Sequence, residues 1–236
     1  MKLRVICIAL LVLATAVAFG QEESEESRPR TIEELYLSQD IELQIIRGQA
    51  LSDDREMKLL ALQNIRSMLE EGNVSEDNPS VFIVLEALAM EGTGRQVRSG
   101  GAVVNNFPEI RRSAAALLGE IGGEQARDVL LEMVLEDNEP MVISEAIYGL
   151  GQIGNNENNQ VTNHIVHVLG RENARQTPDN NLAFASLLAI EKLVENGATV
   201  TDPEVINIIL EVATGRYIRD VRLKAIDVFA ALRRQG

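Results

Sequence analysis

One stretch of the sequence, residues 108–154, most constrains the fold, because it carries the same helical pattern twice. The segment PEIRRSAAALLGEIG is followed 32 residues later by PMVISEAIYGLGQIG, so that Pro108 aligns with Pro140 and Gly122 with Gly154. Amphipathic positions that recur at a fixed offset, separated by Gly, Asp and Asn, are typical of stacked helical repeats. The sequence therefore predicts a repeat architecture instead of a single closed core.

The N-terminal residues 1–20 have the composition of a signal peptide. Lys2 and Arg4 precede an apolar run over 5–19, which ends in a small-x-small cleavage site. The run is too short to span a bilayer comfortably. We therefore expect cleavage before Gln21, export to the periplasm or the medium, and no stable membrane insertion of the mature chain.

The charge and cysteine content narrow the classes of partner. The only cysteine, Cys7, lies in the expected signal peptide, so the mature chain forms no disulfide. Without Lys2 and Arg4, the 22 Lys and Arg residues become 20, against 36 Asp and Glu, a net charge of −16. Such a surface repels phosphate backbones, and there is no basic stripe for nucleic acid or anionic lipid. We expect a protein partner.

The chain after residue 20 divides into a tether and a solenoid. Residues 21–30 contain no apolar side chain and predict a disordered acidic linker. Residues 31–236 predict an all-α, right-handed α-solenoid of about four and a half helix pairs, the last one incomplete. Capping boxes are expected at Thr31–Glu34, Asp53–Glu56 and Thr201–Glu204. The expected core positions of the first two helices are Leu37, Ile41, Ile45, Ile46, Met57, Ala61, Ile65 and Met68.

Two insertions interrupt the repeat, at 92–107 and at 170–181. The first is Gly-rich, locally basic through Arg95 and Arg98, and long for a connection between helices. Either it is a plain flexible connection or it contacts a partner, because long loops on rigid scaffolds often carry recognition. We nominate Arg95 and Arg98 as partner-binding residues, together with Arg216 and Tyr217 before the last helix.

These repeats resemble HEAT repeats, particularly the short variety found in phycobilisome lyases, with a first-helix pattern close to D-x-x-P-x-V-R-x-x-A-x-x-A-L-G-x-I-G. The cationic position of the pattern holds Lys58, Arg111 and Arg222 in three repeats, but Ile143 and Ala183 in the other two. The resemblance implies a solenoid fold and a binding scaffold, and it leaves the ligand open. The best matches are residues 108–122, 137–154 and 219–232.

The chemistry-bearing residues give no catalytic or cofactor site. His164 and His167, three residues apart on a predicted helix, are candidate metal ligands, but zinc would need a further ligand such as Glu157 or Glu172. Ordinary polar helix positions are the alternative. No Ser-His-Asp order and no free thiol remains for nucleophilic catalysis. We therefore expect no metal, no cofactor and no enzyme.

Three functions follow as hypotheses. The first is an exported, non-catalytic scaffold that binds a protein in the bacterial periplasm or envelope. The second is a structural subunit of an envelope assembly, joined, or forming a homo-oligomer, through the apolar end of the solenoid at residues 221–232. The third is a lyase-like or small-molecule-binding protein, suggested only by the subfamily that the repeats resemble.

Overall fold

The computed structural model describes residues 32–198, 200 and 202–234. The expected signal peptide at 1–20 and the linker at 21–30 lie outside these residues. The chain divides into two units, residues 1–41 and 42–236, and the packing below is that of the second unit. The described elements are α2 (Ile32–Ala50), α3 (Arg55–Glu70), α4 (Pro79–Ala89), β1 (Arg98–Ser99), β2 (Ala102–Val103), α5 (Pro108–Ile121), α6 (Gly123–Glu136), α7 (Pro140–Ile153), η2 (Glu157–Asn159), α8 (Gln160–Asn173), α9 (Asn180–Glu195), α10 (Pro203–Thr214) and α11 (Arg219–Leu232).

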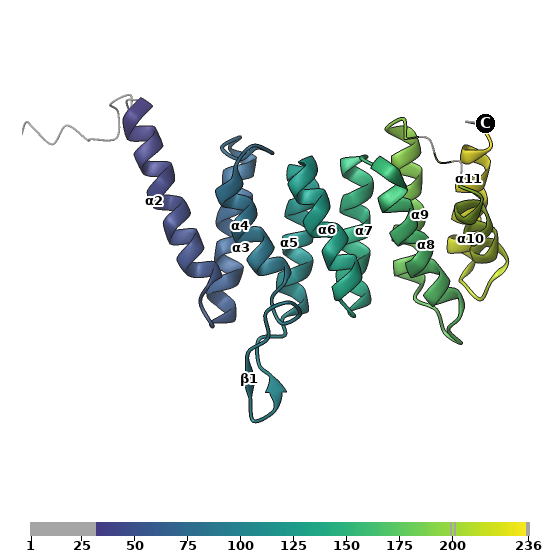
Figure 1. Cartoon of the computed structure of the whole chain (residues 1–236), viewed down its shortest axis with the longest axis horizontal. Coiled ribbons are helices and arrows are strands. Elements are labelled where there is room, and N and C mark those ends of the chain that lie inside the picture. Colours follow the sequence, from purple (N-terminus) through teal and green to yellow (C-terminus); the bar gives the residue numbers. More distant parts are fainter. Residues whose placement is uncertain (1–31, 199, 201, 235–236) are drawn as a thin grey trace, which may run out of the picture. The chain divides into compact units, whose positions relative to one another are not determined.

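The helices of the second unit form two layers (Figure 1). In the layer of first helices, α3, α5, α7, α9 and α11 each contact the next one along the chain. In the layer of second helices, α4, α6, α8 and α10 do the same. Each helix pair therefore buries its apolar side against its neighbours, as expected of stacked repeats. The predicted all-α solenoid is confirmed.

Local sequence signals explain where the helices begin. Proline stands at the first position of α4, α5, α7 and α10, where its missing N–H costs no hydrogen bond. The caps differ in detail from the predicted boxes. Asp54, one residue after the expected Asp53, caps α3 by accepting from Glu56 N, and Asp202 caps α10 by accepting from Glu204 N. Thr31 and Thr201 lie outside the described residues.

Of the core positions predicted for the first two helices, four are buried and three are exposed, while the side chain of Leu37 lies outside the described residues. Ala61 and Ile65 are fully buried and Met68 almost so, whereas Ile41, Ile45 and Met57 are exposed by 58, 56 and 38%. Helical periodicity locates the apolar side of a segment, but only the neighbouring helices decide whether that side is covered. In α3 the buried face begins one residue later, at Lys58.

The structure also differs from the prediction at both insertions. The second is shorter than the expected 170–181, because α8 continues to Asn173 and leaves only residues 174–179 as a connection. The first contains an antiparallel hairpin, with Arg98 opposite Val103 and Ser99 opposite Ala102. Its two-residue turn, Gly100–Gly101, has φ values of 58° and 87°, which glycine adopts without a Cβ penalty.

Glycine lets the first helices approach each other closely at the centre of the stack. A Cβ built on Gly151 would lie 2.5 Å from Ala189 Cα, and one on Gly119 would lie 2.7 Å from Gly149 Cα. Both distances are shorter than real Cβ contacts allow, and the opposing atoms belong to helix backbone. The repeated Gly positions of the sequence therefore fix the spacing between α5, α7 and α9.

Two buried cations join consecutive repeats, because each pairs with a carboxylate just after its own second helix and also donates to a carbonyl oxygen at the end of the preceding second helix. The Lys58 ammonium donates to Glu91 Oε2 at 2.9 Å and to the carbonyl oxygen of Ala50 at 2.9 Å. The Arg111 guanidinium donates to both carboxylate oxygens of Asp137, at 2.5 and 3.2 Å, and to the carbonyl oxygen of Glu91 at 2.9 Å. All four charged side chains are at most 5% exposed. Removal of one partner would leave an uncompensated buried charge.

We predict that Gly151→Ala destabilises the protein by about 1–3 kcal/mol, because the added methyl group would force α7 and α9 apart. Chemical denaturation measures the change. The matched control is Gly48→Ala in α2, where a Cβ meets nothing within 4 Å. The control is expected to stabilise the protein by about 0.5–1 kcal/mol through helix propensity. Equal effects of the two substitutions would contradict the close approach.

We predict that Arg111→Met lowers the free energy of unfolding by about 3–5 kcal/mol, because Asp137 would remain charged and buried without its partner. The control is Arg112→Met, next to it in the sequence, whose exposed guanidinium pairs with Glu145. We expect the control to change stability by at most about 1 kcal/mol. Similar losses in the two variants would show that burial of the pair does not matter.

Candidate functional site

The connections that follow α4, α6, α8 and α10 lie on one edge of the stack (Figure 1). They comprise residues 90–107, 137–139, 174–179 and 215–218. All four predicted partner-binding residues belong to this set, which we call the loop edge. The structure therefore brings Arg95, Arg98, Arg216 and Tyr217 to the same edge, in two separate places. The hairpin projects from this edge near α5 (Figure 1).

The base of the hairpin is held by buried polar contacts. The Asn105 amide donates to Glu91 Oε1 at 2.8 Å and to the Arg95 carbonyl oxygen at 2.7 Å, and its Oδ1 accepts from Val97 N at 2.8 Å. Glu91 in turn binds Lys58, and Asn106 Oδ1 accepts from Arg111 at 2.8 Å. The network that joins the repeats thus also fixes the loop, which is not a slack connection.

The tip of the hairpin is exposed and positively charged. Arg98 donates to Gln96 Oε1 at 2.7 Å and to the Gly101 carbonyl oxygen at 3.3 Å, which holds its guanidinium beside the turn. Arg95 and Arg98 make no ion pair with any residue in the described part of the chain. Val97 and Val104 are also exposed. The tip therefore offers cationic and apolar groups together.

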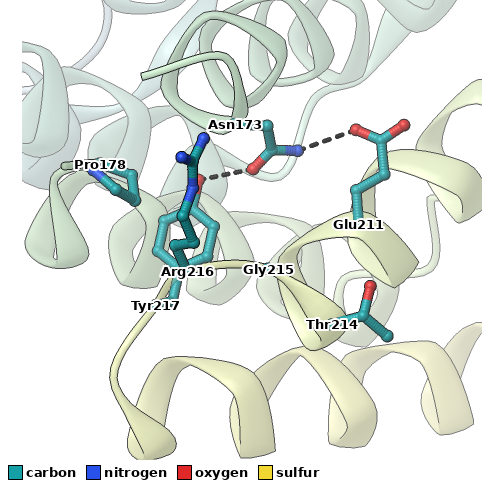
Figure 2. Close-up of a pocket in the computed structure, with 7 residues that line it drawn as sticks. All are labelled: Asn173, Pro178, Glu211, Thr214, Gly215, Arg216 and Tyr217. Atoms are coloured by element: carbon teal, nitrogen blue, oxygen red, sulfur yellow. Dashed lines mark hydrogen bonds between the residues drawn. The ribbon is translucent and has the colours of Figure 1, made fainter. Parts of the chain in front are cut away.

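The second place on the loop edge is a cavity of about 320 Å³ between the end of α8 and the turn from α10 to α11. Figure 2 shows its lining, which includes both Arg216 and Tyr217. Arg216 is exposed, whereas Tyr217 is buried, its exposed fraction being 6%. The complete lining is Asn173, Pro178, Glu211, Thr214, Gly215, Arg216 and Tyr217.

Tyr217 has a structural contact within the cavity. Its hydroxyl donates to Asn173 Oδ1 at 2.6 Å, and the Asn173 amide donates to Glu211 Oε2 at 3.0 Å (Figure 2). Burial, and then the nearby carboxylates of Glu172 and Glu211, raise the pKa of Tyr217 to about 12. The phenol therefore stays protonated at neutral pH and acts as a donor. Arg216 is the better placed of the two to meet a partner.

The predicted metal ligands do not converge. His164 is half-buried, with Nδ1 2.7 Å from the Gln160 carbonyl oxygen, and His167 is exposed. Glu172 is buried and accepts from Arg175 and from Asp179 N, and Glu157 lies 3.6 Å from Arg127. Within the described ranges, no group of three or more His, Cys, Asp or Glu side chains could hold a metal ion.

Sequence reasoning missed the residues that hold the loop edge in place. These are Glu91, Asn105 and Asn106 at the hairpin, and Asn173 and Glu211 at the cavity. Polar residues beside a connection resemble ordinary solvated positions in the sequence. The one available signal was the cationic position of the repeat pattern, because a buried Lys58 or Arg111 requires an acceptor.

No helix among the described residues is both long enough and apolar enough to cross a membrane.

Comparisons with known proteins agree with the fold. Residues 101–177 match the family model of HEAT repeats. A solved structure of similar fold is the complex of CpcE and CpcF of phycocyanin lyase from Nostoc sp. PCC7120. The match has a TM-score of 0.55 and 16% sequence identity, and it covers 91% of this chain and 70% of that chain. No curated protein sequence matches the chain.

The prediction that the chain is not an enzyme is wrong. It depended on the absence of a recognisable triad, thiol or metal cluster from a helical repeat, whereas the matched solenoid structure is that of a phycocyanin lyase. A protein of this fold can thus be part of an enzyme, because function depends on sites and not on fold.

The scaffold interpretation is supported in its coarse form. The repeat pattern, the layered helices and the comparisons agree on the architecture, and the matched structure is a complex of two proteins. A protein partner is therefore consistent with the fold. Together, the match of residues 101–177 to HEAT repeats and the shared fold show that the chain contains HEAT repeats and is similar in fold to the CpcE–CpcF complex of phycocyanin lyase.

Proposed function

We propose that this HEAT-repeat scaffold binds another protein through its loop edge, as one subunit of a protein complex. The hairpin is the main contact, and Arg216 at the cavity is a second one. The observation that carries the proposal is the anchoring of the hairpin by Glu91, Asn105 and the buried cations. Pre-organised loops bind with a smaller entropy cost than flexible ones.

The distribution of charge supports this choice of edge. The connections on the loop edge contain four arginines, Arg95, Arg98, Arg175 and Arg216. The opposite connections, at 71–78, 122, 154–159 and 196–202, contain no Lys or Arg. On a chain with a net charge of −14, this segregation gives one edge local cationic sites.

The side chains at the hairpin tip indicate what kind of protein surface it would bind. Arg95 and Arg98 favour a surface with exposed carboxylates, and Val97 and Val104 favour an apolar contact beside them. Segment 92–107 has two arginines and no Asp or Glu, so it contains no negative charge that would repel an acidic partner. The matched complex of two solenoid subunits is a precedent for protein association by this fold.

We also propose that the chain is exported to the periplasm or secreted, with the signal sequence at 1–20 as the supporting feature. Scaffolding would then take place outside the cytoplasm, in a compartment where the cysteine-free mature chain needs no redox control.

We predict that Arg95→Glu combined with Arg98→Glu weakens binding to the partner at least about tenfold, or roughly 1.4 kcal/mol. A photoreactive residue at exposed position 97 would first identify the partner by crosslinking in native cells. Biolayer interferometry with the purified partner then measures the affinity, and the dependence on salt should decrease in the variant.

The control is Arg47→Glu combined with Arg171→Glu, an equal charge change at two exposed helix positions. It should bind the partner nearly as well as the unaltered chain. An equal loss in the two double variants would mean that only net charge matters, and would exclude the hairpin as the contact.

We predict that the chain in its native host begins at Gln21. Fractionation followed by mass measurement should find the processed form outside the cytoplasm. A variant with Leu10→Arg and Leu13→Arg, which interrupts the apolar run, should stay in the cytoplasm at full length. Recovery of the unaltered chain in the cytoplasm with Met1 or Lys2 at its start would contradict export.

A further inference from the structure

The described repeat array begins with a second helix, α2, and ends with a first helix, α11. These two helices together would make one helix pair. Helix α2 occupies the position of a second helix, because Lys58 of α3 binds the carbonyl oxygen of Ala50 at its end. Arg111 of α5 binds the carbonyl oxygen of Glu91, just after α4, in the same way. At the other end, α11 is a first helix, and it contacts α9 and α10. The described residues place no second helix after it.

Burial patterns identify which positions face the preceding repeat. The third residue of each first helix is buried in α5, α7, α9 and α11, where an earlier first helix is present. In α3, the corresponding residue Met57 is 38% exposed. Because this position remains buried in the last helix and is exposed only in the first, it points toward the preceding repeat. The buried residues are Ile110, Val142, Leu182 and Val221.

The eighth residue of each first helix is buried in every first helix except the last one. It is at most 5% exposed in α3, α5, α7 and α9, but Ile226 of α11 is 52% exposed. The fourth residue has the same burial pattern. It is buried in α3, α5, α7 and α9, whereas Arg222, the fourth residue of α11, is exposed. Both positions therefore point toward a following repeat. The eighth-position residues buried elsewhere are Leu62, Ala115, Ile147 and Leu187.

We infer that these two faces bind each other, so that a second copy of this chain stacks head to tail on the first. In this arrangement α2 of one copy supplies the second helix for α11 of the other. Ile226 of one copy packs against Met57 and the exposed Leu51 of the other. In the same way, the eighth residue of each earlier first helix is covered by the next repeat.

The register also provides a partner for Arg222. In the array, Lys58 and Arg111 take a carboxylate from the end of the following second helix or the connection after it. The corresponding connection of a second copy is residues 51–54, where Asp53 is exposed. Arg222 makes no ion pair with a described residue in its own chain. We therefore pair Arg222 with Asp53 across the interface.

The wider charge distribution selects a second copy as the occupant. Helix α11 and the two arginines after it contain five cations and two anions, Asp220 and Asp227. Residues 42–56 contain four anions and two cations, Arg47 and Arg55. The two faces of this chain are therefore complementary, whereas two copies of the same face would repel each other. The contact is heterologous and can be repeated from copy to copy.

The inference goes beyond the proposed function and does not rest on it, since none of its residues belongs to the hairpin or the cavity. The test uses two single variants of the full chain, Met57→Lys and Ile226→Lys. Both residues are exposed in one copy, so each variant should fold, which circular dichroism checks. Both changes introduce lysine so that two altered faces cannot attract each other.

Sedimentation velocity should show that the mass of the unaltered chain grows with concentration beyond one copy. Each variant alone should weaken association at least about tenfold. An equimolar mixture should form a dimer and nothing larger, because one intact junction remains. A monomeric unaltered chain at every concentration, or dimers of Met57→Lys alone, would overturn the inference.

A charge exchange tests the register. Arg222→Asp should weaken association, and the additional change Asp53→Arg in the same chain should restore it. Failure of the second change to restore association would overturn the assigned ion pair, while partner binding through Arg95 and Arg98 is measured separately.

Discussion

The two buried ion pairs of the first two helix pairs hold both the N-terminal half of the stack and the hairpin in one arrangement. Arg111 of α5 pairs with Asp137 just after α6, and Lys58 of α3 pairs with Glu91 just after α4, both with almost no exposure. Each cation also donates to a carbonyl oxygen at the end of the preceding second helix. Desolvated charges are tolerated only when they are paired and hydrogen-bonded, so each pair specifies one register of the stack.

The same pairs connect the fold to the loop edge. Glu91 accepts a hydrogen bond from Lys58 with one carboxylate oxygen and from Asn105 with the other. A single side chain therefore contacts both the stack and the hairpin base. The hairpin is consequently an extension of the core, although its tip is exposed. At the cavity, Tyr217 and Asn173 hold the start of the last helix in a similar way. Rigid elements thus present the cationic groups on an otherwise acidic protein.

The features that the sequence predicted correctly are local ones. The spacing of apolar residues in 108–154 predicted helices, their buried positions and their repetition, because a helix face is set by residues three and four apart. It failed where a neighbour decides the outcome. Ile45 and Met57 fit the apolar pattern but are exposed. The exclusion of an enzyme relied on missing motifs, whereas a structure of similar fold is that of a phycocyanin lyase.

The class of fold, the order of the helices and the glycine positions that permit close packing all follow from the amino-acid sequence. The packing of the helices set which polar residues are buried, because a charge pair such as Lys58 and Glu91 joins positions 33 residues apart. It also decided that Tyr217 is a buried donor while Arg216 is accessible, a difference between adjacent residues that follows from which side of the turn faces α8. Periodicity describes one helix, whereas burial is a property of the neighbours that surround it.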